Sequence, residues 1–353
     1  MGALCYTLSR GLDFGSDGSK MSAVDKLLCY LLVLFGVPFS FGGKIYEHFG
    51  NVETLESDVV TLEVALDIGR VISFHRKGEP DWLVVFDKAP IPSWHWNPWG
   101  GDRVWPTAQF LHEQIYGNNG FDPVIDGAPW QLVLQTSDRL VMRSGLSPQL
   151  GVRVTRQIQL IEGEAAVVHT YWIERVAQSS YPVHIWAVTG IRRPDYVLMK
   201  SDPGKLHPGG HPYRLWPALY SEVPMGVSLL QDRTALQFAW EKDSRLKLGT
   251  YGGWIAAVSG QQAFCQWIDY SRGQLYLDGS NLQAFVDTHT RTFEIETLSP
   301  TWFLREGEHR QWTVHWEIID FPEGVSTPQG QMEYLDSREM PVPKAGLGES
   351  ALP

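Results

Sequence analysis

The chain has 353 residues, enough for one large domain or two ordinary ones, and a hydrophobic content of 43%, enough for a sizeable core. The formal net charge is −11 and no basic stripe is present in the sequence, so nucleic acid is not an expected partner. The three cysteines, Cys5, Cys29 and Cys265, do not have the spacing of a zinc site or of a disulfide framework. We find no phosphate loop or nucleotide fingerprint, so the sequence predicts neither a metal nor a cofactor.

The first predicted segment is a short apolar run at 27–39, LLCYLLVLFGVPF. It is too short to span a bilayer comfortably, but it has the length of the hydrophobic part of a signal peptide. Ser40-Phe41-Gly42 has the small-x-small pattern of a cleavage site, and Met21 resembles a natural start. We therefore expect residues 1–42 to be an upstream extension plus a signal peptide. The mature protein is then exported to the periplasm or outside the cell, with no stable membrane span. The alternative is a buried core segment.

From Lys44 onward, short β-rich runs alternate with turn signals, a pattern typical of an all-β sandwich or barrel. We expect one antiparallel domain at 43–321 and a C-terminal tail at 322–353 that trails over the surface or is disordered. The only helix candidate worth naming is 107–117. The principal expected strands and hairpins are 59–66, 70–76, 81–87, the hairpin 131–145, the hairpin 152–176, and 181–191.

Tryptophan is abundant, with 15 residues, and many lie beside Gly, Pro, Asn or Asp. Flat indole faces suit sugar rings, whose C–H faces stack on them. The segment 94–106, WHWNPWGGDRVWP, is the densest example, and Gly100-Gly101 would let a ligand approach the backbone closely. A packed turn is the alternative. The residues of this segment that we predict to bind a sugar are Trp96, Trp99, Asp102, Arg103 and Trp105. Arg103 would suit a uronate or a sulfated sugar.

A second informative loop is 207–217, HPGGHPYRLWP. His207 and His211 are four residues apart, but they lie in a Pro/Gly loop and not on a helix, so the spacing is weak as a metal signal. With Tyr213, they are predicted to form a lid or rim over a sugar.

Several motifs together resemble the galactose mutarotase superfamily. The opening DIGRVISFHRKGEPDWLVV (67–85) is similar to the first strands of that superfamily. Three later segments resemble more closely an uncharacterised branch with a GGxRxWPxxQ motif: WNPWGGDRVWPTAQ (96–109), DGAPW (126–130) and FEIETLSPTWFLREGE (293–308). The resemblance implies a supersandwich of large antiparallel sheets with a sugar-binding concave face. Members of this superfamily include epimerases, lyases, hydrolases and non-catalytic modules, so the fold alone does not give the function.

The resemblance also implies catalytic residues. The base of the mutarotases is a Glu in a late strand, and Glu296 is in the matching place. Glu294 is two residues earlier and therefore faces the same side of the strand, where each carboxylate would raise the pKa of the other. The alternative is that both glutamates lie on a solvated face.

The acid of the family is a His on a central strand, which corresponds here to 182–190. The aligned position falls near Val188, a departure from the family pattern. His184 and Trp186 are the nearby candidates, as acid and as substrate contact.

Three functions remain open. The first is an aldose 1-epimerase-like enzyme that acts on a mono- or oligosaccharide, with Glu296 as base. The second is a non-catalytic carbohydrate-binding protein. The third is a polysaccharide lyase, in which Tyr213, His207 or His211 would be the base and Arg103 would neutralise the uronate.

Overall fold

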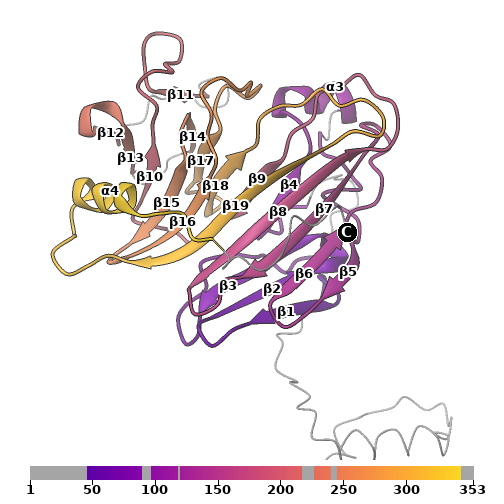
Figure 1. The fold of residues 1–353 in the computed structure, drawn as a ribbon, viewed down its shortest axis with the longest axis horizontal. Helices are drawn as coiled ribbons and strands as arrows, with labels where there is room; N and C mark the ends of the chain where they lie inside the picture. The colour runs from indigo at the N-terminus through magenta and orange to yellow at the C-terminus, as the bar shows by residue number, and fades with distance from the viewer. Residues whose placement is uncertain (1–45, 90–96, 118–119, 217–225, 240–244, 343–353) are drawn as a thin grey trace, which may run out of the picture. The chain divides into compact units, whose positions relative to one another are not determined.

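A computed structural model describes residues 46–89, 97–117, 120–216, 226–239 and 245–342 of the chain. Two large antiparallel sheets pack face to face (Figure 1). Each sheet has two edge strands, so the chain forms a sandwich and not a closed barrel. The predicted all-β antiparallel sandwich is confirmed.

The first sheet has nine strands. In spatial order they are β1 (Val52–Glu56), β2 (Val60–Ala65), β3 (Arg70–Arg76), β4 (Asp102–Trp105), β9 (Trp186–Gly190), β18 (Thr292–Leu298), β17 (Leu282–Asp287), β14 (Arg245–Thr250) and β11 (Tyr213–Leu215).

The second sheet has ten strands. In spatial order they are β12 (Val227–Leu230), β13 (Ala235–Phe238), β10 (Tyr196–Lys200), β15 (Trp254–Ser259), β16 (Gln262–Ile268), β19 (His309–Asp320), β8 (Ala166–Arg175), β7 (Val152–Leu160), β6 (Arg139–Arg143) and β5 (Gln131–Gln135).

The helical segments are short. They are η1 (Leu66–Ile68), η2 (Gln109–Leu111), α3 (His112–Tyr116), η4 (Gln231–Arg233) and α4 (Pro328–Ser337). The segment expected to be helical, 107–117, contains η2 and α3. The two expected hairpins are the pairs β5–β6 and β7–β8.

The main core lies between the two sheets, and strand alternation decides which side chains enter it. Along β18, Phe293 and Ile295 belong to this core. Glu294 and Glu296 therefore point to the opposite face, because successive side chains of a strand alternate. We call that face, turned away from the ten-stranded sheet, the outer face.

The C-terminal tail contains a regular element that the sequence did not predict. In α4, Thr327 caps the N-terminus by accepting a hydrogen bond from the Gly330 backbone N–H, and Pro328 occupies the first turn. Met332 and Leu335, three residues apart, are fully buried against the ten-stranded sheet. Figure 1 shows α4 alongside β15 and β16. The sequence did not predict this helix because most of its residues are polar and only two apolar side chains, Met332 and Leu335, are buried.

We expect Leu335→Ala to lower the free energy of unfolding by about 2–5 kcal/mol, because it leaves a cavity under α4. Chemical denaturation followed by tryptophan fluorescence measures this. Glu333→Ala, on the exposed side of the same helix, is the control and should change stability by no more than about 0.5 kcal/mol. Equal effects of the two substitutions would show that α4 is not docked in solution.

The predicted signal peptide at 27–39 lies outside the described residues, so export remains a prediction. Within the parts of the chain that the structure describes, no helix is both long and apolar enough to cross a membrane.

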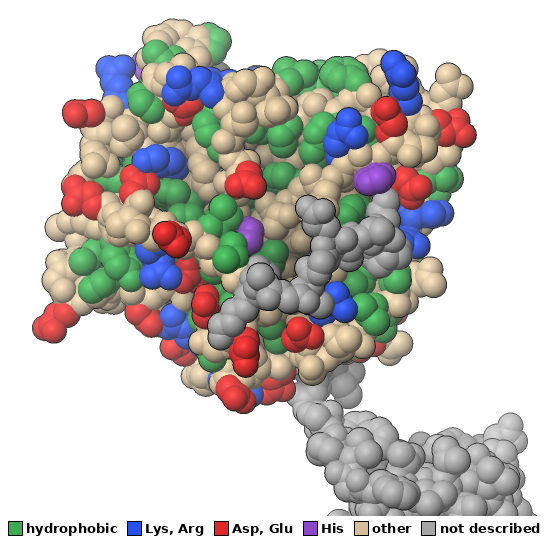
Figure 2. Space-filling view, in the orientation of Figure 1, with side chains coloured by type: hydrophobic (Ala, Val, Ile, Leu, Met, Phe, Trp, Pro, Cys, Tyr) green, Lys and Arg blue, Asp and Glu red, His purple; other side chains and the backbone are tan. Residues whose placement is uncertain are grey.

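On the face seen in Figure 2, acidic and basic side chains are interspersed, with hydrophobic side chains between them.

Candidate functional site

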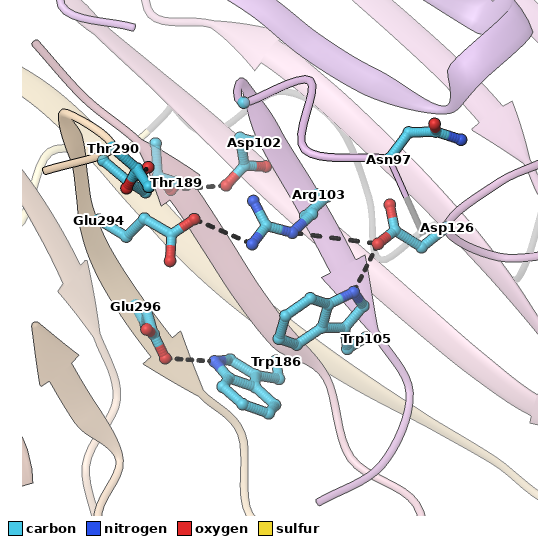
Figure 3. A network of polar contacts seen from close by, with 12 residues as sticks. Asn97, Asp102, Arg103, Trp105, Asp126, Trp186, Thr189, Thr290, Glu294 and Glu296 are labelled. Carbon is cyan, nitrogen blue, oxygen red and sulfur yellow. Dashed lines mark hydrogen bonds and ion pairs between the residues drawn. The ribbon is translucent and has the colours of Figure 1, made fainter. Parts of the chain in front are cut away.

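The candidate site lies on the outer face of the nine-stranded sheet, where β4, β9 and β18 are neighbours. The strand register places Arg103 opposite Val188, and Val188 opposite Glu296. Figure 3 shows side chains of these three strands converging on this face. Arg103 on β4 and Glu296 on β18 are almost 200 residues apart in the sequence, but only β9 separates their strands.

Arg103 is the centre of one ion-pair group. Its guanidinium donates to Glu294 Oε1 at 2.9 Å and lies 3.9 Å from Asp126 Oδ2 (Figure 3). Asp126 also accepts hydrogen bonds from the Trp105 indole N–H, at 2.6 Å, and from Arg70, at 2.9 Å. The Arg103 guanidinium lies over the Trp105 ring at 4.7 Å. Arg103 is only 2% exposed and is held in place on several sides.

Glu296 is the centre of a second group. Its Oε2 accepts from the Trp186 indole N–H at 2.8 Å and lies 2.9 Å from the Lys247 ammonium. The residue is 1% exposed, so it does not lie on a solvated face. Burial raises the pKa of Glu296, and the nearby carboxylate of Glu294 raises it further. Lys247 and the indole N–H act in the opposite direction.

Cations and indole rings alternate along this face. The Lys247 ammonium lies 4.4 Å from the centre of the Trp186 ring and 5.5 Å from that of Trp216. The Arg214 guanidinium lies 4.8 Å from the Trp216 ring. Trp105 and Trp186 meet edge to face at 4.7 Å. These indoles hold cations and are partly or fully buried, so they are poor free platforms for stacking a sugar.

Gln283 provides an unused acceptor beside Glu296. The two residues are partners in the β17–β18 register, on the same face. Gln283 is buried, its amide N–H donates to Ser280 Oγ at 2.9 Å, and its Oε1 has no hydrogen-bond partner in the described part of the chain. A buried acceptor without a partner costs about 1–3 kcal/mol, so this atom is suited to accept a ligand hydroxyl.

Asp102 lies on the other face of β4, between the two sheets. It accepts from Thr189 Oγ1 at 2.6 Å and pairs with Arg156 of β7 at 2.6 Å. Its neighbour Arg103 takes the outer face because adjacent strand residues alternate. Asp102 therefore links the sheets, and it does not face the groups around Glu296.

Gly100 and Gly101 serve the chain's own packing. Both have positive φ, 74° and 66°, and a Cβ would lie 2.2 Å from the Val84 carbonyl oxygen at Gly100 and 2.5 Å from the Val71 carbonyl oxygen at Gly101. The space at these two glycines, which we expected a ligand to use, is occupied by the backbone of Val84 and Val71. Trp99 is also structural: it packs with Phe49, and its indole N–H donates to the Lys88 carbonyl at 2.8 Å.

His184 lies at the edge of the site, just before β9. Its Nε2 is 3.7 Å from Asp278 Oδ2, and its ring meets Trp186 edge to face at 6.4 Å. Burial lowers the pKa of His184, although Asp278 acts in the opposite direction. Val188, not His184, stands between Arg103 and Glu296.

The described part of the second loop, 207–216, includes β11, an edge strand of the nine-stranded sheet. Tyr213 lies in β11, five strand positions from β4, which corresponds to about 24 Å at the usual strand spacing. His207 is buried and stacks on Tyr251 at 4.9 Å with nearly parallel rings. His211 is exposed and contacts Tyr213 at 5.6 Å. The described residues contain no group of three or more His, Cys, Asp or Glu that could hold a metal ion.

The buried imidazole of His207 should make stability depend on pH. Burial, aided by Arg214 and Lys205, lowers its pKa to about 4. The unfolded state, with a pKa near 6.5, then binds more protons between pH 6.5 and 4, so stability falls as the pH falls through this window. Between pH 7 and pH 5 the loss attributable to His207 should be about 2 kcal/mol.

Urea denaturation at both pH values measures this dependence. His207→Phe preserves the stack on Tyr251 and should remove most of it, whereas the exposed His309 can be changed to Gln as a control with no effect. An unchanged pH dependence in His207→Phe would assign the loss to other groups.

Trp96, the remaining predicted contact, lies outside the described residues. Four further residues of this face and its surroundings were not among the predicted site residues: Lys247, Gln283, Asp126 and Arg70. Arg70 and Asp126 are within motifs that carried the family resemblance, but nothing in the sequence gave them a partner. Lys247 stands between the apolar residues Leu246 and Leu248, so strand alternation places its side chain on the face opposite theirs. Nothing in the local sequence indicates its contact with Glu296.

A small pocket opens beside Arg103 and Glu294, next to Gly100 and Gly190. Its volume of about 40 Å³ is sufficient for roughly one water molecule. This pocket by itself is too small for a sugar ring.

Comparison with known proteins gives the fold. No protein-family model matches the chain, and no curated protein matches it. Among solved structures, a candidate aldose 1-epimerase from Escherichia coli K12 matches with a TM-score of 0.53 and 12% identity, over 77% of this chain and 99% of that one. A galactose mutarotase-like protein from Lactobacillus casei ATCC 334 matches with a TM-score of 0.53 and 10% identity, over 76% of this chain and 100% of that one.

A galactose mutarotase related enzyme from Lactobacillus acidophilus matches with a TM-score of 0.50 and 10% identity, over 78% of this chain and 100% of that one. At these identities the likeness concerns the fold. The chain has the β-sandwich fold of the galactose mutarotase-like proteins.

Proposed function

We propose that the outer face around Glu296 binds a neutral mono- or oligosaccharide and that Glu296 is the base of an epimerase-type reaction at its anomeric centre. The observation that carries this proposal is the buried Glu296 carboxylate, with a raised pKa, held by Lys247 and Trp186. A carboxylate whose pKa is moved toward neutrality is suited to take a hydroxyl proton and to return it. The shared fold with a candidate aldose 1-epimerase supports the ligand class.

The charges of the site favour a neutral sugar over a uronate or a sulfated sugar. Arg103, which suggested an acidic ligand, is paired with Glu294 and lies near Asp126. Lys247 is paired with Glu296. An anionic ligand would have to break a buried ion pair, which is strongly unfavourable when it leaves a buried charge without a partner.

A non-catalytic sugar-binding protein is the second candidate, and one observation favours it. Val188 occupies the place beside Glu296 where the resemblance led us to expect an acid. A lyase receives less support, because Tyr213 is five strand positions from Arg103 and His207 is buried against Tyr251.

A binding and turnover screen tests the proposal. The protein is titrated by calorimetry with neutral, uronic and sulfated sugars, and the sugars are followed by NMR. The proposal expects a neutral sugar to bind and its anomers to interconvert faster than in buffer. Binding without interconversion would favour the non-catalytic candidate, and selective binding of charged sugars would contradict the proposed ligand class.

Export is a separate proposal, supported only by the apolar run at 27–39 and the small-x-small pattern at 40–42. Mass spectrometry of the native protein should find an N-terminus close to residue 43. A native N-terminus at Met1 or Met21 would contradict export by this route.

A further inference from the structure

The missing acid has a candidate on the opposite side of Glu296 from Val188. Lys247 lies on β14, where Leu246 and Leu248 enter the core, so its side chain takes the outer face. Its ammonium is 2.9 Å from Glu296 Oε2 and 3.4 Å from Gln109 Oε1, and the residue is only 5% exposed. The Trp186 ring is beside the same ammonium. The donor is therefore held in one place, in contact with the proposed base.

We propose that Lys247 is the proton donor of this site, paired side by side with Glu296. This inference rests on the proposed function and names the second group that the reaction needs. Ring opening requires a proton to leave the hydroxyl on the anomeric carbon and a proton to reach the ring oxygen. Both oxygens are bonded to the same carbon, so a base and an acid that touch each other can serve both atoms.

The proton transfers balance as follows. Glu296 takes the proton of the anomeric hydroxyl, and Lys247 gives a proton to the ring oxygen. The bond between the anomeric carbon and the ring oxygen breaks with its electron pair on the ring oxygen, and a carbonyl forms at the anomeric carbon. The site then holds an open-chain aldehyde, a neutral carboxylic acid and a neutral amine. After the carbonyl turns over, the reverse transfers close the ring as the other anomer and restore both side chains.

The surroundings favour this role over a purely structural ion pair. Arg103, Arg214 and Lys247 are all on the outer face, but Arg103 is engaged by Glu294, and Arg214 is exposed and donates to the Asp278 carbonyl at 3.1 Å. Lys247 places its ammonium 2.9 Å from Glu296 Oε2, in direct contact with the proposed base. It is also a lysine, which can release a proton, whereas a guanidinium cannot do so at ordinary pH.

Lys247→Arg tests the proposal because it keeps the charge beside Glu296 and removes the usable proton. In the wild type, kcat should fall at low pH, as Glu296 is protonated. In Lys247→Arg, kcat should fall by about 100-fold or more with KM within about threefold. Lys77→Arg, at an exposed turn, is the matched control and should leave the rate and its pH profile unchanged.

If Lys247→Arg retains kcat within threefold, Lys247 supplies only charge and the inference is wrong, while the proposed function stands. If the wild type does not interconvert anomers, the proposed function fails and the inference fails with it.

If circular dichroism shows that Lys247→Arg does not fold, the test uses Lys247→Ala instead. Ethylamine is added to this variant to replace the missing amine, and the rate of anomer interconversion is measured. A rate that rises with the amine concentration supports a proton donor at this place. A rate that does not respond to the amine, with the variant folded, overturns it.

Discussion

Glu296→Gln should lower the rate of anomer interconversion by about 10²–10⁴-fold, the usual contribution of a general base. Glutamine keeps the size of the side chain and can still accept the Trp186 N–H, so the sugar should bind with an affinity within about tenfold of the wild type. NMR exchange measurements on the sugar identified by the screen give the rate, and calorimetry gives the affinity.

Glu306→Gln is the matched control for this experiment, because Glu306 is exposed and lies outside the strands that form the site. It should leave both quantities unchanged. A loss of less than threefold in Glu296→Gln would mean that the base is another residue. Loss of binding with an unchanged fold would mean that Glu296 holds the sugar and does no chemistry.

The second large effect is expected in the interior, at the ion pair that joins the two sheets. Asp102 on β4 pairs with Arg156 on β7 at 2.6 Å, and both side chains are fully buried. Arg156 also contacts His169 Nδ1, at 3.0 Å, and burial keeps the pKa of that imidazole well below its usual value. An imidazole is either neutral or positive, so His169 cannot replace Asp102 as the counter-charge of Arg156.

Asp102→Asn should consequently lower the free energy of unfolding by about 3–5 kcal/mol, because it leaves a buried guanidinium without its carboxylate. Urea denaturation measures the change. The double variant Asp102→Asn, Arg156→Met should recover part of the loss, since it removes the unpaired charge.

Lys77→Ala breaks an exposed ion pair with Glu56 and is the comparison, with an expected change of no more than about 1 kcal/mol. A similar cost for Asp102→Asn and Lys77→Ala would show that the buried pair is dispensable.

Local patterns in the sequence were sufficient for the sandwich. The strands expected at 59–66 and 70–76 and the two expected hairpins depend on neighbouring residues, and the structure has β2, β3 and the β5–β6 and β7–β8 hairpins there. The helix α4 was missed because a stripe of two buried residues, Met332 and Leu335, is too weak to outweigh the polar composition around it.

The candidate site was only partly accessible from sequence, for a physical reason. Alternation predicts that Glu294 and Glu296 share a face, and they do. The same rule separates Asp102 from Arg103, although both were predicted as sugar contacts.

Contacts between distant strands could not be predicted in this way. Whether Arg103 meets Glu294 or a ligand depends on the register of β4, β9 and β18, which is set by long-range pairing. The contact of Lys247 with Glu296 likewise crosses β17 and has no local signal.

A crystal structure of the protein with the neutral sugar from the screen decides whether Glu296 and Lys247 face the reacting atoms. We expect the anomeric carbon to lie on the outer face, with its hydroxyl within hydrogen-bond reach of Glu296 and its ring oxygen near Lys247. A sugar bound elsewhere, such as the open depression between Asp202, Trp254 and Asp336, with the Glu296–Lys247 pair untouched, would contradict it.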